Sequence, residues 1–289
     1  MYPARFEYFA PTTVAEAVSI LERYGDDAKV LAGGQSLIPL MKLRFASPRA
    51  LVDINRIAGL DELYEDNDML NVGALVRHKD CEHSELLRRS YGVLADAAPQ
   101  ISDPIVRNLG TVAGSLAHAD PQGDWGSALL AAGASVQVQG PSGTRTISLD
   151  DFFQGPFTTA LEPTEVVTWV QVPEPKGSSG GAYLKLERKV GDFATAAVGV
   201  HVSFSNGTVE RAGIALTGVG PSNMRAQAAE DALAGRELDD EAIAEAGRLA
   251  AEVAEPHDDI RGSAEYKRNV VRVFTERALR KARERREER

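Results

Sequence analysis

The sequence predicts an α+β fold, in which strands and helices alternate early in the chain and are segregated near its end. The chain opens with a strand, a helix, a second strand and a second helix. In its last third, three strand candidates come first and helices alone follow them. Strands followed by a separate run of helices indicate α+β rather than a doubly wound parallel sheet.

Length and composition describe an ordinary globular protein. The chain has 289 residues, of which 43% are hydrophobic and 26% are charged. These fractions lie near the averages for soluble proteins, and the length is enough for two or three domains with cores of their own. The formal net charge is −10. Because nucleic-acid binding depends on clustered Lys and Arg, we expect no nucleic-acid partner.

The cysteine content and the hydropathy pattern limit the location and the cofactors. Cys81 is the only cysteine, so the chain forms no internal disulfide and cannot supply the four thiolates of a typical iron-sulfur cluster. The first residues contain no apolar run of signal-peptide length, and no later run is long enough to span a membrane. We therefore expect a cytoplasmic chain without a transmembrane segment. Any iron-sulfur cluster must sit on another subunit.

The first unit is expected to cover residues 1–57. Thr13 and Glu16 fit a capping box, in which each side chain satisfies an amide at the start of a helix. Apolar residues at helical spacing follow them. The expected elements are a strand at 5–9, a helix at 13–24, a strand at 29–32, a helix after the glycines that follow, and a strand at 50–54.

The second unit is expected to cover residues 58–176. It ends at the segment 173–181, PEPKGSSGG, because prolines, glycines and serines interrupt both the strand and the helix periodicity there. The expected elements are two short strands around a turn at 65–68, a helical stretch at 79–98, a helix at 123–132, a hairpin of strands 135–139 and 144–148, and a strand at 165–172.

The third unit, residues 177–289, is expected to hold three strands followed by helices. Asn206-Gly207 is a strong hairpin turn between the last two strands. The charged tail 276–289 carries seven basic and four acidic residues and is expected to be a solvated helix end, with a subunit contact as the alternative. The expected strands are 182–190, 196–204 and 209–217, and the expected helices are 224–234, 239–254 and 263 to the end.

The first candidate site follows the second strand. Residues Ala32, Gly33, Gly34, Gln35 and Ser36 lead directly into a helix. Glycine permits close approach and positive φ, so that successive amides can face one anion, and the helix dipole adds positive potential. The spacing fits neither the Walker pattern nor the dinucleotide G-x-G-x-x-G pattern. The alternative is a tight strand-to-helix turn that Ser36 caps.

The second candidate site, 108–124, is also rich in small residues and hydroxyls. Its centre is Thr111, Val112, Ala113, Gly114 and Ser115, which can face the other side of the same anion if that anion is a diphosphate. Two carboxylates follow, and because carboxylates repel phosphate, hydroxyls of a ribose or ribityl chain are their better partners. The alternative is a helix start capped by one of these carboxylates. The two carboxylates are those of Asp120 and Asp124.

Together these segments resemble a known family. The sequences AGGQSLIPLMKLR and TVAGSLAHADPQGD, followed by YLKLERKVGDFATAAVGV at 183–200, are similar to the FAD-binding medium subunit of molybdenum hydroxylases, which include carbon monoxide dehydrogenase and xanthine-dehydrogenase-like enzymes. The resemblance covers nearly the whole chain. It implies a two-part FAD-binding domain of the vanillyl-alcohol-oxidase (PCMH) type, followed by a C-terminal domain with a three-stranded sheet and a helical bundle.

The resemblance also implies roles for particular residues. The loops 32–36 and 111–115 would clasp the FAD diphosphate. Asp124 matches the family's flavin-site carboxylate and Lys185 the lysine near the flavin, while Ile101 and Phe193 match positions near the isoalloxazine. The alternatives are a lysine with its ammonium in water and plain core residues at the other two positions. Two positions bear on the match to the commonest pattern. Gln35 stands where His or Gln is common, and Ala113 stands where glycine is common, so that its methyl group requires a negative φ.

The function implied is an electron-transfer subunit. Electrons from [2Fe-2S] clusters on a small partner subunit would pass through FAD to an external acceptor such as NAD, a quinone or oxygen, while substrate is oxidised at a molybdopterin centre in a large subunit. The assembly implied is a dimer of heterotrimers. A self-sufficient FAD-dependent oxidoreductase of the same superfamily, or an assembly module that has lost FAD, are the alternatives.

The remaining titratable residues predict no catalytic group and no metal site. His78, Cys81 and His83 lie close in sequence, but a structural zinc site needs four ligands and no second cluster exists, so we expect a surface helix there. His118 is expected to be oriented by the second loop rather than to act as a base.

Overall fold

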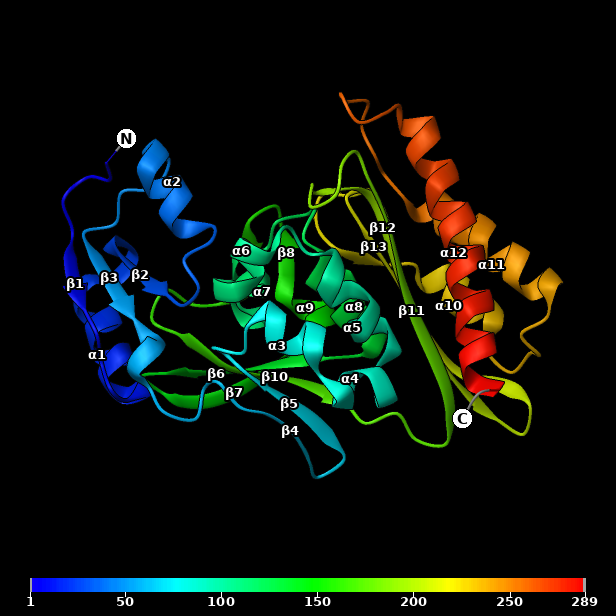
Figure 1. The fold of residues 1–289 in the computed structure, drawn as a ribbon, viewed down its shortest axis with the longest axis horizontal. Helices are drawn as coiled ribbons and strands as arrows, with labels where there is room; N and C mark the ends of the chain where they lie inside the picture. The colour runs from blue at the N-terminus through cyan, green and yellow to red at the C-terminus, as the bar shows by residue number, and fades with distance from the viewer. Residues whose placement is uncertain (1, 288–289) are drawn as a thin grey trace.

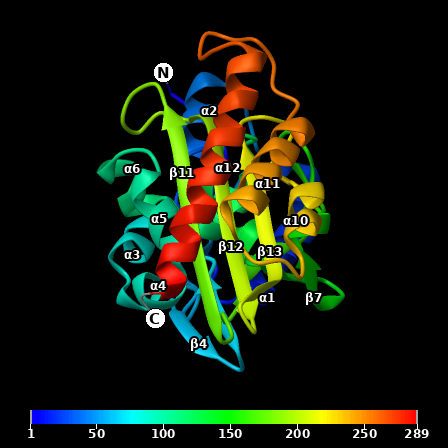
Figure 2. The same ribbon diagram turned by 90° about the vertical axis from the view of Figure 1, so that its right-hand side faces the viewer.

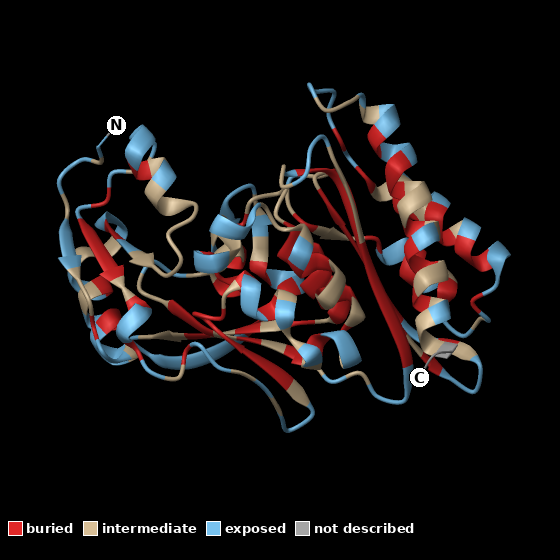
Figure 3. Cartoon of the chain, viewed as in Figure 1, coloured by how far each residue is buried: buried red, intermediate tan, exposed pale blue. Residues whose placement is uncertain are grey.

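The computed structural model describes residues 2–287 and arranges three sheets in chain order along the long axis of the molecule (Figure 1). The sheets contain three, five and four strands, and a separate two-stranded ribbon accompanies the middle sheet. Buried residues gather on the strands and on the helices between the sheets (Figure 3). The predicted α+β class is confirmed.

The first sheet is parallel and has the strand order β1-β3-β2. Helix α1 packs on it because Ala17, Val18 and Leu21 recur on one face of the helix and are buried. The Thr13 hydroxyl accepts from the Glu16 amide at 3.2 Å, as predicted. The Glu16 carboxylate instead accepts from the Thr12 amide. The elements are β1 Glu7–Phe9, α1 Val14–Tyr24, a 3-10 turn Gly25–Asp27, β2 Ala28–Leu31, α2 Leu37–Leu43, β3 Ala50–Asp53 and a 3-10 turn Ile54–Arg56.

The middle sheet is antiparallel with the order β4-β5-β10-β6-β7, and short helices pack against it. Its strands are β4 Leu63–Asp66, β5 Met69–Gly73, β6 Ser135–Gly140, β7 Gly143–Ser148 and β10 Val166–Pro173. The ribbon is β8 Phe153–Gly155 with β9 Thr158–Thr159. The helices are α3 His78–His83, α4 Glu85–Ser90, α5 Gly92–Ala97, a 3-10 turn Ala98–Gln100, α6 Pro104–Leu109, α7 Val112–His118, α8 Asp124–Ala132 and α9 Leu149–Phe152.

The helical stretch expected at 79–98 consists of three short helices, because the chain turns twice within it. Ser84 takes an extended conformation and its side chain accepts from the Leu87 amide, so it ends α3 and caps α4. Tyr91 is also non-helical and separates α4 from α5. Serine competes for backbone donors in this way, which favours a cap over a helix interior.

The third sheet has the order β11-β12-β13-β14 and is antiparallel. The three predicted strands form it, and a fourth strand of two residues extends it. Helices α10, α11 and α12 cover one face (Figure 2). The elements are β11 Ser178–Glu187, β12 Ala194–Ser205, β13 Thr208–Thr217, β14 Met224–Arg225, α10 Gln227–Leu233, α11 Asp240–Val253 and α12 Ala264–Glu287.

Helix α8 fills the space between the middle and third sheets, and every one of its residues is buried. It contacts β10 on one side and β12 and β13 on the other. Gly213 on β13 makes this possible, because a Cβ at that position would lie 2.0 Å from the Ala131 carbonyl oxygen. The start of α8 is therefore held in a fixed position relative to both sheets.

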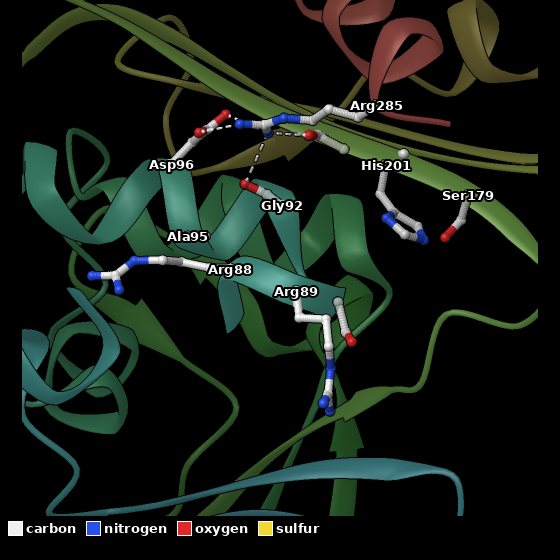
Figure 4. Close-up of a pocket in the computed structure, with 11 residues that line it drawn as sticks. Arg88, Arg89, Gly92, Ala95, Asp96, Ser179, His201 and Arg285 are labelled. Carbon is white, nitrogen blue, oxygen red and sulfur yellow. Dashed lines mark hydrogen bonds and ion pairs between the residues drawn. The ribbon is translucent and has the colours of Figure 1, made fainter. Parts of the chain in front are cut away.

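The end of the chain is also tied to the middle unit. Asp96 on α5 accepts two hydrogen bonds of 2.8 Å from Arg285 and one of 3.1 Å from Lys281, both on α12. Arg285 also donates to the Gly92 and Gly181 carbonyls beside a pocket between α5 and β11 (Figure 4). The tail expected to be a solvated helix end is thus part of α12 up to residue 287, and residues 288–289 lie outside the described range.

Within residues 2–287, no helix is both long and apolar enough to cross a membrane.

Replacing Asp96 with Asn should loosen α12. The Asp96 side chain is only 15% exposed, and the substitution removes the charge from its bonds to Arg285 and Lys281. We expect the free energy of unfolding to fall by about 1–3 kcal/mol in chemical denaturation. Asp240→Asn is the control, because Asp240 pairs with the same helix but is 74% exposed, and it should cost less than about 0.5 kcal/mol. Equal effects of the two variants would contradict this account.

Candidate functional site

The first predicted loop connects β2 to α2. Gly34 has φ of +69°, which favours glycine, and the Ile38 amide donates to its carbonyl at 3.0 Å. The Gln35 side chain donates to the Gly33 carbonyl at 3.3 Å. The strand-to-helix turn of the alternative is present with Ser36 at the cap position of α2, but the Ser36 hydroxyl makes no capping bond to the helix.

The second predicted loop is held at the edge of the middle unit. Arg77 and Thr111 form an isolated β-bridge, and the His78 amide donates to the Gly110 carbonyl at 3.0 Å. Thr111 caps α7, because its hydroxyl accepts from the Gly114 amide at 3.1 Å. Ala113 lies inside α7 and does not have a positive φ. The backbone at Ala113 therefore meets the requirement for a negative φ that its methyl group imposes.

The two loops touch, although they are far apart in the sequence. A Cβ on Gly33 would lie 2.2 Å from the Leu109 carbonyl oxygen and 2.8 Å from the Gly110 Cα. The backbones of the two segments therefore approach more closely than any side chain allows at this point. One ligand can contact both loops only if they come together, and the structure brings them together.

The buried His78 side chain packs against the second loop. Its Nδ1 accepts from the Trp125 indole at 3.0 Å, and its ring packs against Gly110. Burial, together with the positive charges of Arg107 and Arg77, lowers the pKa of His78 to about 4. The expected surface helix is wrong for His78 and Cys81, which are buried. Within residues 2–287, no group of His, Cys, Asp or Glu side chains is arranged to hold a metal ion.

Asp124 and Lys185 form a buried pair at the start of α8. The Asp124 carboxylate accepts from Lys185 Nζ at 2.9 Å and from the Tyr183 hydroxyl at 2.7 Å. Lys185 also donates to the Gln100 carbonyl at 2.9 Å. Burial raises the pKa of Asp124, and the charge of Lys185 opposes that rise.

This geometry decides two of the alternatives. The Lys185 side chain is 1% exposed. The alternative in which its ammonium group lies in water is therefore wrong. Gly123, rather than a carboxylate, occupies the cap position of α8, and Asp124 lies in the first turn. Asp120 instead accepts from the Gln122 amide within the preceding loop.

Ile101 and Phe193 lie on two loops that touch each other. Arg107 donates to the carbonyls of Ile101 and Ser102 at 3.0 Å each. A Cβ on Gly191 would lie 2.9 Å from the Ser102 carbonyl oxygen. Ile101 packs partly buried against the core, whereas the Phe193 side chain is 50% exposed. The core-residue alternative is therefore wrong for Phe193.

The predicted residues form a connected series. The first loop contacts the second, and Ser115 at the end of the second loop lies near Gly123, next to Asp124. Asp124 then binds Lys185 from the third sheet. His118, which was expected to be oriented by the second loop, lies against Phe157 in a tilted contact, with ring centroids 5.2 Å apart.

Three polar residues of this region were not predicted, namely Asn55, Arg77 and Tyr183. Tyr183 had a usable signal, because residues two apart on a strand share a face and Lys185 was already a candidate. Asn55 donates to the Ala32 carbonyl at 2.8 Å, and Arg77 contacts Leu109. No local sequence pattern distinguishes these two residues, since their role depends on how the loops pack.

Comparison with known proteins identifies the class. Residues 4–175 match the family model described as the FAD binding domain in molybdopterin dehydrogenase. Residues 181–282 match the CO dehydrogenase flavoprotein C-terminal domain. The chain belongs to the family of FAD-binding medium subunits of molybdenum-containing dehydrogenases. It is an FAD-dependent oxidoreductase subunit, and the predicted resemblance and cofactor are confirmed.

Particular relatives are similar along their full length. The carbon monoxide dehydrogenase medium chain of Hydrogenophaga pseudoflava is 42% identical over 96% of this chain and 97% of that protein. A 6-hydroxypseudooxynicotine dehydrogenase complex subunit alpha of Paenarthrobacter nicotinovorans is 37% identical over 98% and 96%. Solved structures agree with these matches. A carbon monoxide dehydrogenase from H. pseudoflava superimposes with a TM-score of 0.95 at 44% identity, covering 99% of each chain. Quinoline 2-oxidoreductase from Pseudomonas putida 86 gives 0.90 at 32% identity, covering 98% and 99%.

Replacing Gly33 with Ala should separate the two loops. The added methyl group would overlap the Leu109 carbonyl, so that the loops cannot keep their spacing. We expect FAD affinity to fall by about tenfold or more, corresponding to about 1.4 kcal/mol, when flavin is titrated into the ligand-free chain. Gly25→Ala is the control, because Gly25 has positive φ but no neighbour at its Cβ position. If Gly33→Ala binds FAD as tightly as the wild type does, the contact between the two loops is not required for FAD binding.

His78 should make the protein acid-sensitive. Its pKa is lowered to about 4 in the folded protein, so below its ordinary value the unfolded chain binds a proton that the folded chain excludes. Stability should therefore fall as the pH drops from about 6.5 to about 4, by up to about 1.4 kcal/mol per pH unit.

His78→Asn keeps an acceptor for Trp125 and should remove this part of the pH dependence. Urea unfolding at several pH values measures it. His257→Asn, at an exposed position, is the control. The same pH slope in His78→Asn and in the wild type would show that another group is responsible.

Proposed function

We propose that this chain holds FAD between its two glycine loops and passes electrons from a partner subunit to an external acceptor. The observation that carries the proposal is the backbone contact between Gly33 and Leu109–Gly110. That contact leaves no room for a Cβ and places two amide-rich segments side by side. Such a cradle fits a diphosphate better than a ligand that needs side-chain ligation.

The residues proposed to hold the cofactor fall into three groups. Backbone amides of the two loops and the hydroxyls of Ser36, Thr111 and Ser115 would bind the diphosphate. Asp124 and Lys185 would serve the sugar-alcohol and ring region, and Ile101 and Phe193 would contact the ring. The loop residues are Ala32, Gly33, Gly34, Gln35, Ser36, Thr111, Val112, Ala113, Gly114 and Ser115.

The Asp124–Lys185 pair would give the site a stable electrostatic environment. When bound, the flavin supplies redox chemistry in which electrons are accepted singly or in pairs. Because Lys185 and Tyr183 both donate to Asp124, the carboxylate is held in place by residues of the third sheet. The chain itself positions the cofactor, and we assign no residue to acid–base catalysis.

The chain's composition and its relatives support the partners that we propose. Cys81 is the only cysteine, so [2Fe-2S] clusters would belong to a small subunit and molybdopterin to a large one. Relatives are named as medium chains or subunits of dehydrogenases and of a hydroxylase. We propose a heterotrimer that pairs into a dimer, with substrate chosen in the large subunit and with NAD, a quinone or oxygen as acceptor. The domain division at residues 57 and 176 stays a prediction.

Flavin reduction tests this function. The purified chain should bind one FAD, and its flavin absorbance should remain oxidised when substrates of the related dehydrogenases are added to it alone. After assembly with its small and large subunits, substrate should bleach the flavin. The same assembly built with Gly33→Ala is the control and should contain little flavin. Substrate turnover by the isolated chain would contradict the proposal, and so would the absence of FAD binding.

A further inference from the structure

Two side chains outside the predicted site connect the two glycine loops. Asn55 Nδ2 donates to the Ala32 carbonyl at 2.8 Å, where the first loop begins. Asn55 Oδ1 accepts from Arg77 Nη2 at 2.5 Å. Arg77 Nη1 donates to the Leu109 carbonyl, just before the second loop. A continuous path of hydrogen bonds therefore runs from one loop to the other.

Asn55, which lies within this path, is itself held in place. Asp53 Oδ1 accepts from the Asn55 backbone amide at 2.9 Å and from its side chain at 2.6 Å. The other Asp53 oxygen accepts from the Tyr8 hydroxyl at 2.5 Å. Since Asp53 ends β3 and Tyr8 lies on β1, the first sheet holds Asn55 in the orientation that meets Arg77.

Arg77 is suited to this position by its shape. It bridges two acceptors on separate segments, and the planar guanidinium presents several donors in a fixed fork, whereas a lysine is a single point of charge. The backbone of Arg77 is fixed as well. Its amide donates to Asp80 Oδ2 at 3.0 Å, and Arg77 forms an isolated β-bridge with Thr111.

Arg77 also carries a positive charge that the two loops lack. Neither loop, 32–36 nor 111–115, contains Lys or Arg. Both oxygens that Arg77 contacts belong to neutral groups. Its half-buried guanidinium has a lowered pKa because of desolvation, although Asp80, Asp53 and Asp61 oppose that shift. Arginine stays charged at such values, so a permanent positive charge lies beside the cradle.

We infer that Arg77 is a positioning residue that sets the spacing of the two loops and thereby the affinity of this chain for the diphosphate of FAD. This inference rests on the proposed function. Arg77 acts on the ligand through the loops, with Asn55 as its link to the first loop and Leu109 as its link to the second.

The test compares variants of the full chain in binding FAD, ADP and AMP. Arg77→Gln should weaken FAD and ADP by about tenfold or more, and AMP, which lacks the diphosphate, by less than about threefold. Arg77→Lys keeps the charge but cannot bridge both acceptors, so it should recover less than half of the loss on a logarithmic scale. Arg283→Gln is the control, because Arg283 also donates to a backbone carbonyl, that of Leu238, but lies on α12. It should bind all three ligands as the wild type does.

Asn55→Ala tests the path itself and removes only an exposed side chain. It should also weaken FAD and ADP, and the double variant with Arg77→Gln should lose less than the product of the two single effects, because both residues act in one network. Multiplicative losses would overturn a shared path. The single variant Asn55→Ala also keeps the inference testable if Arg77→Gln does not fold.

The outcomes separate the inference from the proposed function. If the wild-type chain binds neither FAD nor ADP, the proposed function fails. If the wild type binds FAD and Arg77→Gln binds it within twofold, only the role of Arg77 is overturned. Full recovery by Arg77→Lys would show that charge alone matters, and an equal loss of AMP and ADP would show that the diphosphate is not the group affected. Either result overturns the positioning role.

Discussion

The site depends on one backbone contact between segments that are distant in the sequence. Gly33 meets Leu109 and Gly110 so closely that a methyl group cannot fit between them. This contact joins the parallel sheet at one end of the molecule to the antiparallel sheet in the middle. A diphosphate has several oxygens to satisfy, and amides from two segments can surround it where those from one segment cannot. The contact supports our proposal that the two loops form one diphosphate site.

The third unit completes this site from the other side. Its residues Tyr183 and Lys185 bind Asp124 at the start of α8. Asn223 donates to the Gly123 carbonyl at 3.1 Å, and the hydroxyls of Ser127 and Thr217 lie 2.5 Å apart. A buried network of this kind is stable only when every member has a partner. The sheet after residue 177 therefore fixes the position of the Asp124 carboxylate, which we propose to lie on the flavin side of the site.

Much of the fold was predictable because it follows local rules. The hairpin at Asn206-Gly207 has positive φ at both residues, as this turn requires. The helix α1 begins at its predicted cap and buries its predicted stripe. The breaks at Ser84 and Tyr91 were not predicted, because a serine in a helical pattern can either continue the helix or cap the next one. Tertiary packing decides between these two outcomes.

The site was predictable in part, and for a different reason. The two loops and Asp124 belong to motifs whose spacing resembles a family, so the residues were named without knowledge of their contacts. The burial of Lys185 could not be read from its strand, since alternation gives a face but not what covers it. Asn55 and Arg77 belong to no motif, and their contacts exist only because two sheets meet at the loops.

The most direct test of the central claim is an experimental structure of the chain with FAD bound. The account predicts that the diphosphate lies between residues 32–36 and 111–115, within hydrogen-bond distance of backbone amides from both loops, with Gly33 still in contact with Leu109. A diphosphate that contacts only one loop, or lies elsewhere in the molecule, would contradict the account.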